Sequence, residues 1–424
     1  MKTNSQNRIQ RIEALQIIDS RGIPTVQATV VLSCGSIGVA RVPSGASTGQ
    51  YEAFEKRDNG KSYGGKSVLS AVEAIRGQIQ DTLLVNQPKS IFETDTLLRK
   101  TDGTEHKSTL GANALLAVSI AYTKAVADSF KMPLFQYLGG VQARLLPIPM
   151  MNILNGGAHA DNNLDIQEFM IMPVGASSFS QAIQMGCETY HGLKRLLKEK
   201  GLSTSVGDEG GFAPNLKSHH EALGLICDAI ELSGYRVGTD IALALDVAAS
   251  EWYHNGSYRL PKADQVKTKD ELFRYYEKLC LDFPIVSIED PFADEDFDAF
   301  KEFTEAHPEI QIVGDDLFVT NSQRIRQGIE RHAANAALIK PNQIGTVSEA
   351  LDAISLSQEN SYNTVISHRS GDTDDDFIAD LAVAVNAGQI KTGAPCRGER
   401  VAKYNRLLEI EAYLGRTAAY GKFY

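Results

Sequence analysis

The sequence predicts an α/β protein in which a small α+β domain precedes a (β/α)8 barrel of the TIM type. Three observations predict this fold. The first third of the 424-residue chain reads as strands followed by helices, the rest shows short apolar runs alternating with helical patterns, and six of these runs end at charged or polar residues. A chain of this length can bury a large core, so it needs neither disulfides nor a structural metal for stability.

The amino-terminal part has the patterns of a small α+β domain. Residues 25–32 and 37–42 alternate in strand fashion around a turn at 33–36, and helical patterns cover 68–84 and 110–129. The segment 131–149, with three prolines and a Gly-Gly pair, is a plausible domain boundary. We therefore predict an amino-terminal domain at 1–138 and a barrel domain at 139–424.

The remaining apolar runs are spaced by about 20 to 45 residues, which suits one βα unit each. They end at Asp246, Glu289, Asp315 and Lys340, at His368 with Arg369 and Ser370, and at Lys391. The carboxyl ends of all strands of a (β/α)8 barrel meet at one face, where the active site lies. A doubly wound open sheet is a weaker interpretation, because its first turn favours G-x-G-x-x-G and the sequence has no such motif.

Asp246, Glu289 and Asp315 would be carboxylates on neighbouring barrel strands. Oxygen ligands without His or Cys favour a hard cation, Mg²⁺ before Mn²⁺. A single acid at a strand end commonly caps the following helix, but three in register with Lys340 next favour a metal site. Asp316 should point to the opposite side of its strand and support the ligands from behind.

Lys340 has two interpretations that the sequence leaves open. It is a candidate base if its pKa is lowered, which nearby Mg²⁺ ions and Lys391 would do, or it forms an ion pair with one of the acids. Glu209, in SVGDEGGFAPN, and Glu168, in DIQEFMIMP, are two further acids. Two acidic groups near one site raise one another's pKa, which leaves one of them protonated as a general acid.

Arg369 and Ser370, in ISHRSG, offer a guanidinium fork and a hydroxyl suited to clamping a phosphate or carboxylate. The loops SGASTG at 44–49 and NGGAHADNN at 155–163 are rich in glycine and polar residues. Such loops are usually only turns, but beside a catalytic site they are candidate lids.

The composition excludes several other classes. A net charge of −11 without a run of Lys or Arg argues against nucleic acid or an anionic membrane as the main partner. Five scattered cysteines without a C-x-x-C pair indicate reduced thiols, and the amino terminus lacks the apolar core of a signal peptide. Polar residues interrupt the longest apolar stretch, at 110–126, so no membrane span is expected and we predict a cytoplasmic protein.

Twelve strings occur in the order found in enolases: IIDSRGIPT, VPSGASTG, DGTEHKSTLGANALLAVS, MNILNGGAHADNN, QEFM, VGDEGGFAPN, ALDVAASE, SIEDPF, VGDDLFVTN, LIKPNQIGT, SHRSGDTDDDFIADLAV and QIKTGAP. The chain resembles the enolase family over about residues 17–414. The resemblance implies an enolase-type barrel whose second strand runs antiparallel to the others. It also implies the Mg²⁺-dependent, reversible dehydration of 2-phosphoglycerate to phosphoenolpyruvate, a hydro-lyase reaction of glycolysis and gluconeogenesis.

By motif position, the resemblance also implies the roles of individual residues and two Mg²⁺ ions per site. Asp246, Glu289 and Asp315 would bind one ion and Ser47 the second. Lys340 would remove the C2 proton, and Glu209, assisted by Glu168, would protonate the departing C3 hydroxyl. His159, Gln167 and His368 would line the site, Arg369 and Ser370 would hold the phosphate, and Lys391 would hold the carboxylate. Two Mg²⁺ ions and two lysines would stabilise the negative charge that forms when a proton leaves the carbon beside a carboxylate.

Three departures from the family pattern lie elsewhere. Leu15, Gln27 and Glu409 stand where enolases commonly have Arg, Glu and Arg, at positions that contribute to a homodimer interface. We therefore expect a dimer that is weaker or held by more apolar contacts. A relative acting on another carboxylate is a rival interpretation, but SHRSG and the two loops argue against it. A fold retained only for interactions is a second rival, and it would be indicated by loss of a catalytic residue, which the sequence does not show.

Overall fold

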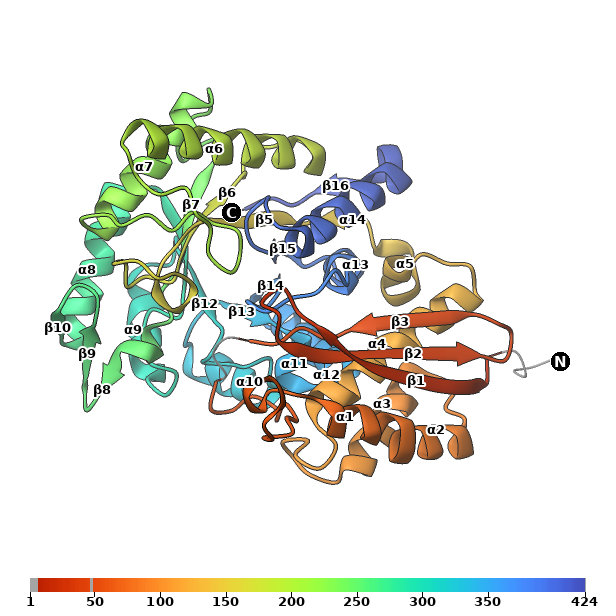
Figure 1. Ribbon diagram of the computed structural model, residues 1–424. Helices are drawn as coiled ribbons and strands as arrows, with labels where there is room; N and C mark the ends of the chain where they lie inside the picture. Colours follow the sequence, from red (N-terminus) through yellow and green to blue (C-terminus); the bar gives the residue numbers. More distant parts are fainter. Residues whose placement is uncertain (1–6, 46–48, 424) are drawn as a thin grey trace.

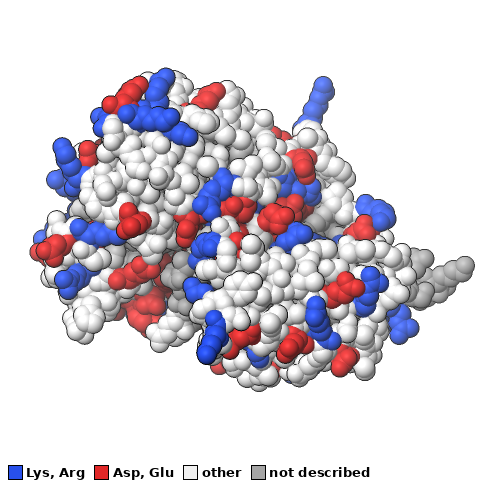
Figure 2. Space-filling model, in the orientation of Figure 1, with Lys and Arg blue, Asp and Glu red and all other residues white. Residues whose placement is uncertain are grey.

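The computed structural model describes residues 7–45 and 49–423, and it confirms the predicted fold class. A small α+β domain packs beside a closed barrel of eight strands, with helices around the outside of the barrel (Figure 1). None of the helices within these ranges is long and apolar enough to cross a membrane. Acidic and basic side chains are interspersed across the face shown in Figure 2, and no continuous basic patch covers it.

The small domain has an antiparallel sheet in the order β1-β2-β3, formed by β1 (Ile9–Ile18), β2 (Pro24–Leu32) and β3 (Ile37–Arg41), and four helices, α1 (Leu69–Ala74), α2 (Gln80–Asn86), α3 (Ile91–Asp102) and α4 (Ala112–Ser129). Helix α4 packs on β2 and β3. A Cβ at Gly38 would lie 2.0 Å from the carbonyl oxygen of Ala121, so only glycine permits this close approach.

The predicted strands and helices of this domain are present with shifted ends. A π-helical turn at Ile75–Ile79 interrupts the predicted helix at 68–84. Strand β1 was not predicted, because a register shift between Ile9 and Arg11 breaks the alternation of buried and exposed residues.

The barrel consists of β5 (Ile148–Asn155), β6 (Glu168–Met172), β7 (Ala242–Asp246), β11 (Ile285–Glu289), β12 (Gln311–Gly314), β13 (Ala336–Ile339), β14 (Asn363–Ser367) and β15 (Gly388–Lys391). The six apolar runs of the sequence are β7 and β11 to β15. Strand β6 pairs antiparallel with both neighbours, which confirms the expected reversal of the second strand. Every residue of β5 and β6 is buried, so neither strand shows the alternation by which strands are recognised.

The helices around the barrel are α6 (Phe179–Glu199), α7 (His219–Leu232), α8 (Lys269–Asp282), α9 (Phe297–Ala306), α10 (Ser322–Arg331), α12 (Val347–Glu359), α13 (Phe377–Ala384) and α14 (Gly398–Leu414). Shorter elements are α5 (Leu134–Gly139), α11 (Pro341–Ile344), β4 (Leu145–Leu146), β8 (Tyr253–His254), β9 (Ser257–Leu260), β10 (Gln265–Lys267) and β16 (Ala419–Tyr420). Several helices begin at a Ser or Thr whose side chain accepts a backbone hydrogen bond, as Thr268 does with Glu271 in a capping box before α8.

Apolar side chains, among them Met150, Met170 and Leu338, fill the inside of the barrel. The small domain meets the carboxyl ends of the strands, where Ser44 and Gly371 exchange two backbone hydrogen bonds of 2.7 and 2.9 Å. Among the apolar side chains inside the barrel, Gln311 and Gln389 exchange two hydrogen bonds across it, and the end of the barrel that carries charged side chains lies under the loop that follows β3.

Candidate active site

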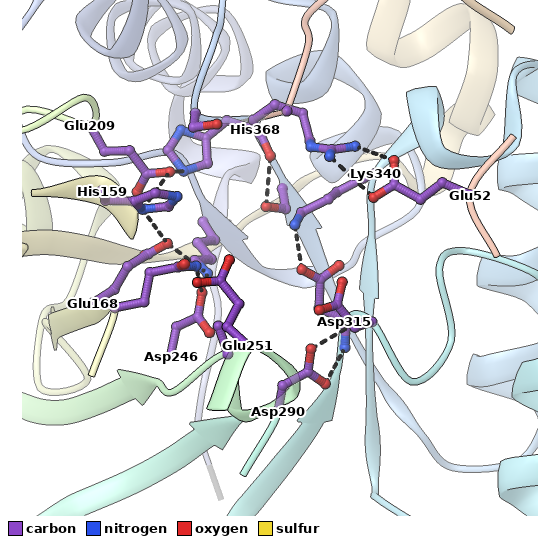
Figure 3. A pocket seen from close by; sticks show the side chains of 18 residues that line it. Glu52, His159, Glu168, Glu209, Asp246, Glu251, Asp290, Asp315, Lys340 and His368 are labelled. Atoms are coloured by element: carbon purple, nitrogen blue, oxygen red, sulfur yellow. Dashed lines mark hydrogen bonds and ion pairs between the residues drawn. The ribbon is translucent and has the colours of Figure 1, made fainter. Parts of the chain in front are cut away.

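A polar pocket lies at the carboxyl ends of the barrel strands (Figure 3). The side chains around it are mostly acidic or basic and include His159, Gln167, Glu168, Glu209, Asp246, Asp315, Lys340, His368, Arg369, Ser370 and Lys391. Every one of these had been singled out in the sequence. The free volume of about 40 Å³ exceeds the room that one water molecule needs.

The reversed direction of β6 explains how Glu168 reaches this end of the barrel. Because β6 is antiparallel, its first residue lies level with the last residues of its parallel neighbours, and Glu168 pairs in register with Asp246. Asp246 in turn pairs with Glu289. Three carboxylates thus stand side by side on β6, β7 and β11.

Lys391 neutralises this row of carboxylates from the end of β15. Its Nζ lies 2.8 Å from Asp246 Oδ2, 2.8 Å from Glu289 Oε2 and 3.2 Å from Glu168 Oε1. Burial would lower the pKa of Lys391, but the surrounding carboxylates outweigh this and hold the pKa well above its ordinary value. Even so, burial and the charge of Asp246 raise the pKa of Glu289 well above normal. One lysine therefore does not fully neutralise the row.

Lys340 forms an ion pair with Asp315, at 2.5 Å between Nζ and Oδ2. Asp315 Oδ1 also accepts a 2.9 Å hydrogen bond from the side chain of Gln343. Burial would lower the pKa of Lys340, but the charge of Asp315 outweighs it and the net pKa is raised. Of the two interpretations of Lys340, the chain alone shows the ion pair: Asp315 touches the ammonium, and the repulsion from Arg369 and Lys391 does not compensate for it.

Asp316 does not lie behind the site, which corrects the expectation from the sequence: its side chain lines the pocket. Strand β12 ends at Gly314, so the alternation of side chains no longer applies at Asp316. Its carboxylate gathers with those of Asp290 and Asp315, and ligand atoms of the three lie within 4.8 Å of one another. Burial and the charge of Asp315 raise the pKa of Asp316 to about 8.

Asp290 was not found from the sequence. Its two carboxylate oxygens accept hydrogen bonds from the backbone N–H groups of Asp315, at 3.0 Å, and Asp316, at 2.7 Å. It thereby fixes the turn that carries both acids. The only feature of the sequence that points to Asp290 is its position directly after Glu289, at the end of a predicted strand.

The acids Glu168 and Glu209 share one neighbour on the other side of the pocket. His159 Nδ1 lies 3.6 Å from an oxygen of each, and Glu209 accepts a 2.9 Å hydrogen bond from Asn152. Burial and the charge of Glu209 hold the pKa of Glu168 well above normal. Burial would raise the pKa of Glu209 also, but the charges that His368 and His159 carry when they are protonated outweigh it, and the net pKa is lowered. In the chain alone, the proton of the pair therefore belongs to Glu168.

Arg369 projects toward the small domain, where it meets Glu52. Its two terminal nitrogens lie 2.9 and 3.1 Å from the two oxygens of Glu52, in a bidentate pair with little exposure to solvent. Glu52 Oε1 also accepts a hydrogen bond from the N–H of Gly49. No sequence pattern indicates Glu52, because its partner lies 317 residues further along the chain.

The two candidate lid loops differ in what can be described. In the loop at 155–163, Lys262 Nζ binds the carbonyl oxygens of Gly157, at 2.7 Å, and Ala160, at 3.0 Å. The loop at 44–49 contains Ser47, the expected ligand of a second metal ion, which lies outside the described residues.

Within the described ranges, two clusters of three side chains have the spacing of a metal site. One is His159 with Glu168 and Glu209, and the other is Asp290 with Asp315 and Asp316. The predicted set of Asp246, Glu289 and Asp315 is divided in the structure: Lys391 binds the first two and Lys340 the third. All of these side chains except His159 offer oxygen ligands, and burial together with the charge of Asp246 raises the pKa of Glu289. Their chemistry fits a hard divalent cation.

Two family models together match almost the whole chain. One, described as the N-terminal domain of enolase, matches residues 9–138, and the other, described as the C-terminal TIM barrel domain of enolase, matches residues 143–423. An enolase from Acidothermus cellulolyticus is 56% identical over 413 residues, which are 97% of this chain and 96% of that protein.

Proposed function

The chain belongs to the enolase family, and on this premise we propose how its own residues carry out the family's reaction. Its function is that of an enolase, a lyase that reversibly dehydrates 2-phosphoglycerate to phosphoenolpyruvate in glycolysis. Dehydration needs a base for the proton on one carbon and an acid for the hydroxyl leaving the next. The observation that carries the proposal is that Lys340 and Glu209 face one carboxylate-lined pocket from opposite sides (Figure 3).

We propose that Asp246, Glu289 and Asp315 hold one Mg²⁺ ion, and that Ser47 contributes to the binding of a second. The all-oxygen donor set supports this, as does the row of three carboxylates that shares the single ammonium of Lys391. Bound Mg²⁺ supplies stabilisation of the negative charge that develops on the substrate carboxylate. Lys391 adds a positive charge to the same region and binds that carboxylate.

Lys340 is the proposed base for the C2 proton. Its ammonium is buried and its pairing with Asp315 fixes its position, but the same pairing keeps it protonated. Lys340 therefore becomes a base only when Asp315 ceases to stabilise its positive charge.

Glu209 is the proposed acid for the C3 hydroxyl, with Glu168 as the source of its proton. The pair is buried and Glu168 holds the proton in the chain alone. His159, which lies 3.6 Å from both carboxylates, is placed to pass the proton from one to the other. Gln167, which donates to Asp246 at 3.2 Å, orients the carboxylate next to this pair.

Arg369 and Ser370 form the proposed phosphate site. A guanidinium can bind two phosphate oxygens at once. In the chain alone Glu52 pairs with both terminal nitrogens of Arg369 and fixes the guanidinium at the edge of the pocket, so a bound phosphate would share or replace this pairing. This geometry favours a phosphorylated substrate over the other carboxylates on which enolase-like barrels act.

The reaction is tested directly by following phosphoenolpyruvate formation from 2-phosphoglycerate. Protein freed of metal with EDTA should be inactive and should recover when Mg²⁺ is added. Full activity in the presence of chelator would exclude the proposed metal chemistry.

The roles of base and acid are separated by exchange of the C2 proton with solvent deuterium. Lys340→Ala should abolish exchange, whereas Glu209→Gln should block turnover and retain exchange, because removal of the proton precedes loss of the hydroxide. Each loss should reach on the order of 10²- to 10⁴-fold or more. If the two variants lost exchange equally, the assignment of separate roles would be wrong.

We propose further that the protein acts in the cytoplasm and that its two domains meet at 138/139. We also propose that it forms a homodimer with an altered interface. Within the chain, Gln27 accepts a 2.9 Å hydrogen bond from Arg41 and Glu409 lies 3.1 Å from Arg406. Both side chains thus have partners in their own chain, and the dimer would depend on other contacts, such as the half-exposed Leu15.

A further inference from the structure

His368 lies between two charged side chains of opposite sign. Its Nδ1 is 2.5 Å from a terminal nitrogen of Arg400, and its Nε2 is 3.4 Å from Glu209 Oε1. The ring is buried, and Nε2 has no hydrogen bond of good geometry to any described residue. Nε2 is thus a buried polar atom directed toward the acid of the pocket.

The chemistry of Arg400 decides which ring nitrogen carries the proton. A guanidinium has only N–H donors and stays charged in proteins. A nitrogen in contact with it must therefore be the acceptor, so Nδ1 of His368 carries no proton. In a neutral imidazole the proton then lies on Nε2, on the side that faces Glu209.

We propose that Arg400 is a positioning residue that holds His368 as the neutral Nε2–H tautomer, so that His368 presents a fixed N–H group toward Glu209 and does not exchange protons with it. His159, the other histidine beside Glu209, has no such restraint. Its Nδ1 has no hydrogen-bond partner among the described residues and lies equally close to Glu168 and Glu209. Proton transfer within the carboxyl pair is thus left to His159.

Arg400 is built into the fold firmly enough to impose this tautomer. It is fully buried, and its guanidinium also donates to the carbonyl oxygens of Arg369 and Ser370, both at 2.5 Å, and of Asp208, at 3.1 Å. These carbonyls belong to the segments that carry His368 and Glu209. One side chain therefore fixes the distance between the two segments as well as the tautomer.

A glycine opposite Arg400 makes room for it. Gly393 has a φ of +81°, and a Cβ there would lie 2.9 Å from Arg400 Cδ and 2.7 Å from the carbonyl oxygen of Glu209. Any other residue would push the guanidinium and the acid-bearing loop apart. The neighbouring acids Glu399, 3.4 Å from Nε, and Asp372, 3.8 Å from a terminal nitrogen, balance the buried charge.

The charged groups that face the His368 ring are Glu209, Arg400 and Asp372. Burial is the main influence and lowers the pKa of His368; the two acids oppose it and Arg400 adds to it, which leaves a pKa of about 4. This agrees with a ring that stays neutral while the enzyme works, although the inference itself rests on the contact with Arg400.

The tautomer can be observed in the wild-type protein by ¹⁵N nuclear magnetic resonance with labelled histidine. The chain has nine histidines, and the spectrum of His368→Gln identifies the signals of His368. We expect an unprotonated Nδ1 and a protonated Nε2, for the most part unchanged between about pH 5 and pH 8, where ordinary histidines titrate. A proton on Nδ1, or titration of His368 within that range, would overturn the proposal.

Two variants test the part played by Arg400. Arg400→Lys retains a charged group with donors only and should preserve the Nε2–H tautomer, whereas Arg400→Met should release it and raise the proton affinity of His368 at least about tenfold. An unchanged tautomer and pKa in Arg400→Met would refute the role of Arg400. If that variant does not fold, the wild-type spectrum still decides the tautomer, and Arg400→Lys still must preserve it.

The consequence for catalysis rests on the proposed function, but the tautomer does not. An Nε2–H ring in a protein without dehydratase activity would contradict the proposed function alone. An Nδ1–H ring in an active protein would contradict this inference alone.

Discussion

Lys391→Met should destabilise the protein strongly in the absence of divalent metal and much less in its presence. The substitution keeps a long side chain of similar shape but removes the ammonium that contacts Asp246, Glu289 and Glu168. All four side chains are almost inaccessible to solvent, so water cannot take over the role of the ammonium. Three buried carboxylates would then face one another without this cation.

The size of the effect follows from the burial of the pair. Removing one partner from a buried ion pair costs about 3–5 kcal/mol. The unfolding entropy of 424 residues is about 0.9 kcal/mol per kelvin, at about 2.1 cal/mol/K per residue. The apparent Tm in EDTA should therefore fall by about 3–6 °C. A cation bound by the same carboxylates restores the missing positive charge, so Mg²⁺ should recover at least about half of this loss.

Thermal unfolding in EDTA and over a series of Mg²⁺ concentrations measures the effect, at about pH 8 to limit protonation of the acids. Lys403→Met is the matched control, because Lys403 is equally buried and binds Asp372 at 2.8 Å, outside the pocket. Mg²⁺ should not rescue the control. If Mg²⁺ raised the Tm of the two variants equally, the row of carboxylates would not be part of the metal site.

Two further predictions concern stability and assembly. Burial raises the pKa of Asp95, which accepts a hydrogen bond from the N–H of Ser348, to about 6. The folded state then holds this proton more tightly than the unfolded state, so ionisation of Asp95 lowers stability from about pH 4 to about pH 6, by at most about 3 kcal/mol. Asp95→Asn should flatten this part of the curve of unfolding free energy against pH in urea titrations, and an unaltered curve would contradict the reasoning. In sedimentation velocity over a dilution series, the altered positions Leu15, Gln27 and Glu409 predict a dimer that is weak or nearly insensitive to salt. A tight dimer that salt readily dissociates would be inconsistent with this.

The barrel could be predicted because six of its strands end at charged or polar residues. Six apolar runs followed by charged residues, such as Leu245 before Asp246 and Ile339 before Lys340, defined both the strands and the face that they share. Strands β5 and β6 have no such mark, because they are buried along their whole length. Only the resemblance to a family indicated that β6 is reversed, which is what brings Glu168 to the site.

The residues that carry charge into the pocket could be predicted, but those that hold them in place could not. Glu52 orients the guanidinium of Arg369. Asp290 accepts hydrogen bonds from backbone N–H groups, and Arg400 contacts a ring nitrogen of a histidine. The contact of Glu52 joins the small domain to the barrel, and the contact of Arg400 joins helix α14 to the end of β14. No local sequence pattern encodes contacts between residues so far apart in the chain. The alternation of a strand does not predict where Asp316 points, because β12 ends two residues before it.

The two lysines of the pocket are held by the same carboxylates that are proposed to bind metal, and this links ligand binding to the activation of the base. Asp315 keeps Lys340 protonated by direct contact, and Lys391 is held in the same way by Asp246 and Glu289. A carboxylate oxygen that coordinates a cation stabilises a neighbouring ammonium less, so the pKa of Lys340 must fall when Asp315 becomes a ligand. The proposed base is then available only in a site that also carries the charge needed to stabilise the product of proton removal. A lysine kept protonated until then cannot remove a proton in a site that lacks the cation.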